Sequence, residues 1–158
     1  MYKEMRKNLK NKLLKDNKVK KYKAVFDRVG YFTHKDAMPS PTICLKNIVD
    51  ESYNLIADHM WFRYSINFRK VGELEKGDQL TFTAQTRSYY KGQAHSKKED
   101  YKLTEPKNVR LISRQQLKPL PHTKRLILGY VLNKNNVNSE IFSEDYVSEY
   151  LEWLKSRI

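Results

Sequence analysis

The alternation of apolar and polar residues between Asp78 and Tyr90 constrains the fold of this chain more than any other feature. Its two sets of positions are the apolar Leu80, Phe82 and Ala84 and the polar Thr81, Thr83, Gln85 and Arg87. Period-two alternation of this length is typical of a strand with one packed face and one face in water. We therefore predict a long strand here, with Arg87 and Tyr89 on its wet face.

The segment before this strand predicts a second strand and a short helix. Leu55 to Arg63 is rich in apolar and aromatic residues, as in a strand. Ser65 to Lys76 contains two apolar residues three apart and then Gly72, which predicts one or two helical turns with a glycine stop. A turn before Asp78 then starts the long strand, and we expect its Gly77 to need a positive φ.

The rest of the central region completes a five-stranded pattern. Three further segments predict strands: Tyr22–Phe32, Thr42–Val49 and Tyr101–Ile112, the last interrupted by Pro106. Connections are expected at His34–Pro41, Asp50–Asn54 and Lys91–Asp100. Five strands with a helix between the third and the fourth indicate a mainly β OB-fold barrel, whereas an SH3-like barrel does not place a helix there.

The net charge of the chain indicates what kind of partner it binds. The chain has 158 residues, which suits one domain, and its formal net charge is +13. Such an excess favours a polyanionic partner, because counterion release drives basic proteins onto nucleic acid. An acidic protein partner or a solubility role stays open. The eleven tyrosines supply rings that can stack while half exposed and also form hydrogen bonds.

The N-terminal segment is the most basic part. Met1 to Lys23 holds ten Lys or Arg, and apolar residues at spacings of three and four make an amphipathic helix over Tyr2–Leu14 plausible. A helix packed on the barrel, a membrane-surface helix and a basic arm that orders on a partner are the alternatives, and we favour the arm. We assign residues 1–20 to this arm, residues 21–112 to the barrel and residues 113–158 to a tail. The candidate phosphate contacts of the arm are Lys10, Lys12, Lys15, Lys18, Lys20 and Lys21.

The tail predicts a linker and a terminal helix. Ser113 to His122 contains two prolines and reads as a linker, and residues 143–157 carry helix signals with Ser143 as the N-cap. This helix has an apolar stripe formed by Val147, Tyr150, Leu151, Leu154 and Ile158, with Trp153 off its centre. The stripe either docks on the barrel or binds a partner, which would be a host protein or a second copy.

Catalytic motifs are not found. The five glycines are isolated, which excludes a glycine-rich phosphate loop, and four scattered His with one Cys give no zinc-site spacing. Cys44 lies in an apolar run and is expected to be a small buried side chain. Asp58 and His59 are adjacent in a strand, so we expect them on opposite faces. We predict no enzyme, no cofactor and no metal, and the absence of a signal peptide or spanning segment predicts a cytoplasmic protein.

Several short motifs also resemble a known group of proteins. They are Ala57-Asp58-His59-Met60-Trp61, Gly77-Asp78, Tyr90-Lys91-Gly92, Tyr101-Lys102-Leu103 and Pro106-Lys107-Asn108-Val109. This pattern, spread over residues 21–112, resembles small and mostly uncharacterised OB-fold proteins of bacteria, archaea and mobile elements. The resemblance implies the fold and no particular activity.

Aromatic and cationic residues gather on the predicted sheet and its loop. The candidate nucleic-acid contacts are Lys46, Trp61, Arg63, Arg87, Tyr89, Tyr90, Lys91, Lys97, Lys98 and Lys102. Rings that stack on bases beside cations that meet phosphates are what single-stranded nucleic acid requires. We predict a non-enzymatic protein that binds single strands of DNA or RNA. The alternative is a phage- or element-encoded inhibitor or adaptor that uses its basic surface against a host protein.

The sequence leaves open on which face of its strand Trp61 lies. A groove with exposed aromatic rings would favour nucleic acid, and a flat patch with an exposed helix stripe would favour a protein partner.

Overall fold

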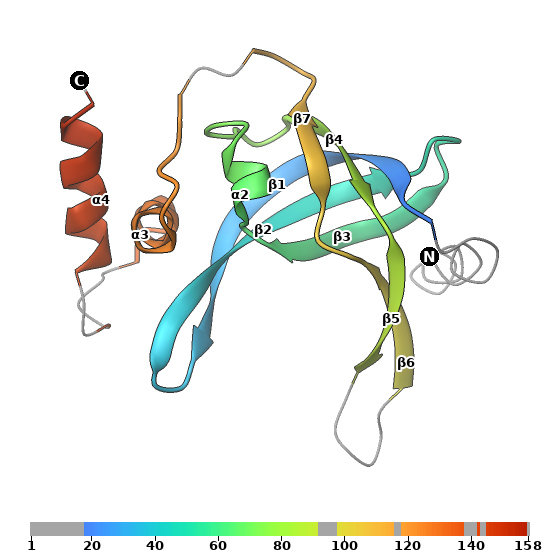
Figure 1. The fold of residues 1–158 in the computed structure, drawn as a ribbon, viewed down its shortest axis with the longest axis horizontal. Helices are drawn as coiled ribbons and strands as arrows, with labels where there is room; N and C mark the ends of the chain where they lie inside the picture. The colour runs from blue at the N-terminus through green and yellow to red at the C-terminus, as the bar shows by residue number, and fades with distance from the viewer. Residues whose placement is uncertain (1–17, 92–97, 116–117, 138–141, 143–144, 158) are drawn as a thin grey trace.

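A five-stranded antiparallel sheet forms the centre of the computed structural model, which describes residues 18–91, 98–115, 118–137, 142 and 145–157 (Figure 1). The sheet has the order β3-β2-β1-β4-β7. Its strands are β1 (Lys20–His34), β2 (Ala37–Val49), β3 (Leu55–Arg63), β4 (Gln79–Ala84) and β7 (Lys107–Leu111). A separate hairpin of β5 (Thr86–Lys91) and β6 (Lys98–Leu103) extends away from it (Figure 1).

Three helices accompany the strands in the described part of the chain. They are α2 (Ile66–Arg69), α3 (Lys124–Lys134) and α4 (Tyr146–Lys155). In Figure 1, α3 and α4 lie together at one end of the molecule, with α3 nearer the sheet. None of the described helices combines the length and the apolar character needed to cross a membrane.

The mainly β class, the five-stranded sheet and the helix between the third and fourth strands are confirmed. The third strand has the predicted bounds, and Gly72 follows α2 with a φ of 81°. Gly77 has a φ of 96°, as the predicted turn requires. The closed barrel is not confirmed: β3 and β7 are the two edges of the described sheet, and no ladder joins them.

The loop predicted at His34–Pro41 is wrong. A tight turn at Asp36, with a φ of 58°, joins the two strands, and β2 continues through both prolines. The Pro41 carbonyl accepts the Tyr64 N–H at 3.0 Å, so the Pro41 nitrogen also faces the β3 side. Because β3 ends at Arg63, the missing N–H of Pro41 removes no ladder hydrogen bond.

The long strand predicted over Asp78–Tyr90 is divided at Gln85. The Gln85 N–H donates to Thr104 Oγ1 at 2.9 Å, and the Thr104 N–H donates to the Gln85 carbonyl at 2.7 Å. These bonds join the end of β4 to the end of β6, where the hairpin starts. The predicted alternation nevertheless continues through the break, because Thr86 is buried and Arg87 is exposed.

The last predicted strand, Tyr101–Ile112, is also divided. Its first part belongs to β6 and its second to β7, with Pro106 between them as the sequence indicated. The two parts lie in different sheets, because β6 pairs with β5 in the hairpin and β7 pairs with β4 in the main sheet.

The core lies between the inner face of the sheet, α2 with the segment after it, and α3. Its largest fully buried residues include Tyr22, Ile43, Leu45 and Phe82 of the sheet and Phe68 of α2. Phe82 stacks on Tyr22 with the ring centroids 5.8 Å apart and meets Phe62 edge-on at 6.1 Å. Burial of this apolar surface is the main force that holds the curved sheet on the helix.

Helix α3 was not predicted. Its buried residues face both the sheet and α4: Ile127, Leu128, Gly129, Tyr130, Val131 and Leu132. A helix covered on two sides carries no amphipathic pattern, so its short apolar run gave no helix signal. Thr123 caps its start by accepting the Leu126 N–H at 3.3 Å.

The expected packing of the terminal helix needs correction. Asp145, and not Ser143, is the N-cap of α4, where it accepts the Ser148 N–H at 3.2 Å. Tyr146 and Tyr150 are buried on this helix, and the partly buried Trp153 packs on the same core. Of the predicted stripe, Leu151 and Leu154 are instead exposed by 41% and 43%. The final residue, Ile158, lies outside the described part.

Helix α4 packs against α3, and not directly against the sheet. A Cβ on Gly129 would lie 2.1 Å from the Tyr146 carbonyl oxygen and 2.8 Å from Tyr150 Cβ. Only the absence of a side chain at Gly129 lets the two helix backbones approach this closely. Arg125 of α3 adds a two-bond ion pair to Glu149 of α4, at 2.7 and 2.6 Å.

Candidate functional site

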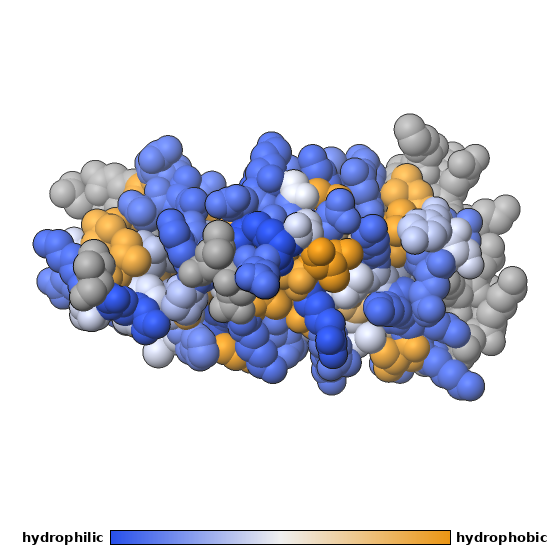
Figure 2. All heavy atoms as spheres, turned by 90° about the horizontal axis from the view of Figure 1, so that it is seen from above, coloured by the Kyte–Doolittle hydropathy of each residue, from blue (hydrophilic) through white to orange (hydrophobic). Residues whose placement is uncertain are grey.

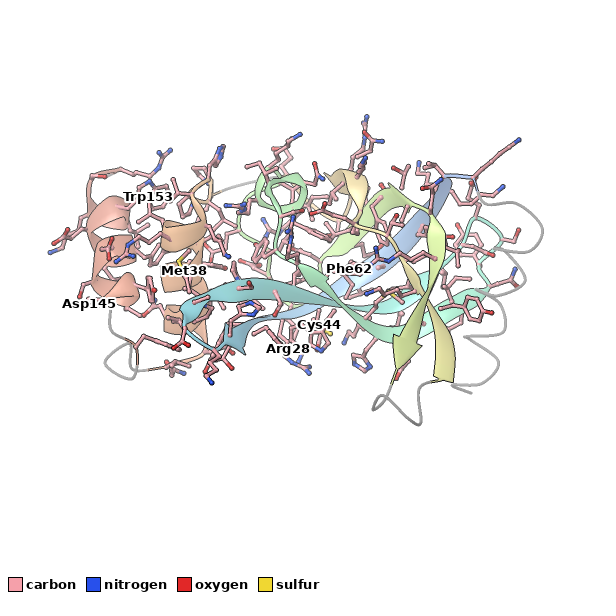
Figure 3. All side chains as sticks on the ribbon, turned by 60° about the horizontal axis from the view of Figure 1, so that its bottom comes forward. Arg28, Met38, Cys44, Phe62, Asp145 and Trp153 are labelled. Atoms are coloured by element: carbon pink, nitrogen blue, oxygen red, sulfur yellow. The ribbon has the colours of Figure 1, made fainter. Side chains whose placement is uncertain are left out.

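The outer face of the sheet carries a row of three side chains across β1, β2 and β3. Arg28 pairs with Cys44, and Cys44 pairs with Trp61. Directly paired residues point to the same face, so this row shares the face opposite the buried Phe62. Figure 3 shows Arg28 and Cys44 side by side at the ribbon of β1 and β2. Trp61 is 47% exposed, which answers the question that the sequence left open.

Neighbouring residues position the Trp61 ring. The Arg28 guanidinium carbon lies 5.2 Å from the ring centroid, as in a cation–π contact. A Cβ on Gly30 would lie 3.1 Å from two atoms of the ring, so the glycine makes room for the indole against the sheet. Asp27 is buried and forms an ion pair with Arg28. The sequence did not indicate Arg28, because a register shift between Phe26 and Arg28 breaks the alternation of β1.

Burial of Cys44 agrees with its expected role. Its side chain is fully buried in the middle of the row, and burial raises the pKa of the thiol, whereas the positive charge of Arg28 opposes that effect. A thiol kept neutral by burial is unreactive.

More cations share this outer face. Lys46 pairs with His59, and Thr42 pairs with Arg63, whose side chain is 74% exposed. His59 is also exposed, and its Nδ1 lies 3.1 Å from the Asp58 carboxylate. The prediction that Asp58 and His59 lie on opposite faces is therefore wrong. Asn47 of the facing strand has a φ of 52°, and exposure stops alternating at this point of β3.

A groove of about 480 Å³ opens where β3 faces the β5–β6 hairpin. It brings together four of the residues predicted from the sequence: Trp61, Arg63, Arg87 and Lys102. Its remaining lining is Met60, Phe62, Leu103 and Glu105. The groove occupies the side at which the sheet is not closed, so the open edge of β3 forms one wall.

Positive charge dominates this groove. Arg87 and Lys102 stand directly opposite each other across the hairpin. The pKa of Lys102 is lowered by burial and further by the Arg87 charge. Like charges in this arrangement destabilise a hairpin. The carboxylate in the lining, Glu105, lies 3.4 Å from the Arg63 guanidinium, across the open side of the sheet.

The other predicted contacts on the hairpin are placed by backbone register alone. Tyr89 pairs with Asp100, Tyr90 with Glu99, and Lys91 with Lys98. Lys97 lies outside the described residues. The hairpin therefore brings two predicted lysines to the same end of the two strands.

The predicted basic arm is described only at its end. Lys10, Lys12 and Lys15 lie outside the described residues, and Lys18 is exposed. Lys20 and Lys21 do not belong to an arm, because β1 starts at Lys20, and the two pair with Ala84 and Thr83 of β4. The first strand thus begins two residues earlier than the apolar pattern indicated.

Three residues in or next to the groove were not indicated by the sequence: Glu105, which lines it, and Arg69 and Lys124 close by. Arg69 ends the one-turn helix α2, Glu105 lies in a connection and Lys124 starts α3, and at such positions no periodicity marks a face. In the described part of the chain, no three His, Cys, Asp or Glu side chains gather in a group that could hold a metal ion.

Comparisons with protein-family models, curated proteins and solved structures found no match for this chain. The resemblance to small OB-fold proteins therefore stays a prediction, and the function must be argued from the residues of the groove.

Proposed function

We propose that this protein binds single-stranded nucleic acid in the groove between β3 and the β5–β6 hairpin, and that it catalyses no reaction. One observation carries the proposal: Trp61, which is half-exposed on the outer face of the sheet, lines the same groove as the cations Arg63, Arg87 and Lys102. An aromatic face stacks on a base with about 1–3 kcal/mol, and the cations meet the phosphates on either side of it.

The charge arrangement supports an anionic ligand. Arg87 and Lys102 repel each other in the free protein, and a phosphate between them would turn this cost into two charge-assisted hydrogen bonds. Single strands are the expected form, because a base must leave a duplex before its face can reach Trp61.

The fold proposed with this function is an OB-fold that is open on one side. The helix lies between the third and fourth strands, and pairing of β3 with β7 would close the sheet into a five-stranded barrel. OB-folds are partly open barrels that bind oligonucleotides on the face of strands 2 and 3 and on adjoining loops. The outer face of β2 and β3 and the β5–β6 hairpin correspond to those positions.

The N-terminal segment is proposed to add phosphate contacts. Much of the +13 charge lies in residues 1–20. Deletion of residues 1–17 should leave the sheet folded, because β1 starts at Lys20. It should weaken binding and flatten the salt dependence, because each lost phosphate contact reduces the slope for single strands by about 0.7.

The second candidate, an adaptor or inhibitor that binds a cytoplasmic host protein, has one observation in its favour. Leu151 and Leu154 of α4 are exposed, whereas Tyr146 and Tyr150 of the same helix are buried. The face shown in Figure 2 is mostly hydrophilic, with hydrophobic residues in separate small areas. Protein interfaces have apolar centres, whereas this surface is mostly hydrophilic and the groove is lined by cations. We therefore favour nucleic acid as the partner.

Fluorescence anisotropy tests the proposal. Labelled single- and double-stranded DNA and RNA of equal length are titrated at several salt concentrations. Arg110→Gln, on the exposed face of β7, is the control for loss of one positive charge outside the groove. We expect tighter binding of the single strands, with log K falling linearly against log salt. Equal binding of duplex and single strand, or no binding of either, would contradict the proposal.

A further inference from the structure

A second cavity, of about 370 Å³, adjoins the groove. Arg63 and Glu105 line both, so the two lie next to each other at this ion pair. The second cavity is bounded by the end of β3, by α2 and by the start of α3, and the residues that matter for its chemistry are Ser65, Arg69 and Lys124.

Arg69 is a partly buried cation that forms no ion pair with a carboxylate in the described part of the chain. Its Nη1 donates to the His122 carbonyl at 2.5 Å, whereas its buried Nε has no hydrogen-bond partner in the described part of the chain. Burial lowers the pKa of Arg69, the Arg63 charge lowers it further, and Tyr64 acts in the opposite direction. No described carboxylate forms an ion pair with Arg69. A guanidinium held in this way is costly unless an anion joins it.

Ser65 gives an independent indication of a ligand. Its side chain is only 8% exposed, and its hydroxyl also has no partner among the described residues. Buried hydroxyl groups in proteins are almost always hydrogen-bonded, so this unpaired Oγ, which has almost no exposed surface of its own, marks a polar position beside the cavity that rotation of the Ser65 side chain would turn toward a ligand. Ser40 and Asn67 add further hydrogen-bonding side chains to the same wall.

The start of α3 contributes positive charge from the opposite side. Lys124 is the first residue of the helix and lines the cavity, and the first turn of α3 contains no acidic residue. Helix starts favour negative charge, so Lys124 here adds to a positive end instead of neutralising it. An anion in the cavity would be close to Lys124 and Arg69 together.

We infer that this second cavity binds the terminal phosphate of the strand held in the groove. The inference rests on the proposed function. A terminal phosphate is a dianion with several acceptor oxygens, which matches two cations and unpaired hydroxyl and Nε–H donors. An internal phosphodiester carries a single charge, whereas a terminal phosphate carries up to two, so the cations that line the cavity favour the terminal group. The protein therefore recognises a phosphorylated end of a strand.

The experiment compares oligonucleotides of about eight nucleotides with a 5′-phosphate, a 3′-phosphate or neither, in anisotropy titrations. We expect one phosphorylated end to raise affinity about tenfold in the wild type. Lys124→Gln and Arg69→Gln should abolish the gain. Lys124 is exposed, so its variant keeps the fold even if Arg69→Gln does not. Lys70→Gln removes an equal charge next to α2 but outside the cavity, and it should keep the gain.

The possible outcomes distinguish failure of this inference from failure of the proposed function. Equal gains from both phosphorylated ends, or a gain that survives Lys124→Gln, would overturn the inference while single-strand binding stands. Failure of all three oligonucleotides to bind would overturn the proposed function and the strand-end reading together. In an NMR titration, inorganic phosphate should shift the amide signals of residues 63–69 and 122–124 in the wild type and not in Lys124→Gln. Absence of those shifts would overturn the inference even if oligonucleotides bind.

Discussion

Replacement of Arg87 by Gln should change stability and binding in opposite directions. Arg87 stands directly opposite Lys102 across the β5–β6 hairpin. A like-charge pair in this position costs roughly 0.2–1 kcal/mol. Arg87 is exposed, so solvent and salt screen part of the repulsion, and we expect Arg87→Gln to stabilise the protein by about 0.5 kcal/mol. For a chain of this size that raises Tm by about 2 °C.

The pH dependence of this gain follows from Lys102. The pKa of Lys102 is below its ordinary value of 10.5, first because of burial and then because of Arg87. The charged form is therefore the destabilised one, and the repulsion is fully present below the folded-state pKa. It fades as the pH rises from that value towards 10.5. The stability difference between Arg87→Gln and wild type should shrink over the same range.

Binding should weaken although the variant is more stable. Loss of one phosphate contact should reduce affinity for single strands about tenfold and reduce the salt slope by about 0.7. Urea unfolding and anisotropy on the same samples measure both effects, with Arg110→Gln as the control that lowers charge without touching the groove. A variant less stable than wild type that binds with an unchanged salt slope would refute this reasoning.

Three further predictions concern the fold. Gly77→Val should lower the free energy of unfolding by about 1 kcal/mol or more, because a φ of 96° disfavours a β-branched residue even in open space; an unchanged urea midpoint would show that the turn is drawn wrongly. Gly129→Ala should destabilise by about 1–3 kcal/mol although Ala normally favours helices, since the new Cβ would meet the Tyr146 carbonyl; a raised Tm would contradict the helix contact. Asp78 has a pKa below its ordinary 3.8, because its hydrogen bonds with Arg114 and backbone outweigh burial, which alone would raise it. Its stabilisation is present above 3.8 and is lost as pH falls through the folded-state pKa; in acid titrations Arg114→Met should be less stable near neutral pH and show this loss at higher pH than wild type.

Local patterns predicted the centre of the fold well. The bounds of β3, the glycine stop after α2 and the positive φ at Gly77 all follow from apolar pattern and glycine placement. The wet face of Arg87 follows from alternation that continues through the break at Gln85. These features depend on short stretches of chain, which is where period and turn chemistry are informative.

Features that depend on tertiary contacts were not predictable. The break at Gln85 depends on its bonds to Thr104, and α3 is covered on two sides, which removes the pattern that would mark it. The candidate site shows the same division. The strand residue Arg87 was found by parity, whereas Arg28 follows a register shift and Arg69 lies in a short helix.

The most direct test of the central claim is the fluorescence of Trp61 as single strands bind. Trp61 and Trp153 are the two tryptophans of the chain, and Trp153 packs on α4 against Tyr150, so Trp153→Phe leaves Trp61 as the reporter. If a base stacks on the half-exposed ring, single-stranded oligonucleotides should quench its emission to saturation, and Trp61→Ala should lose about 1–3 kcal/mol of binding. Oligonucleotide binding with unchanged Trp61 emission and with full affinity in Trp61→Ala would contradict the account.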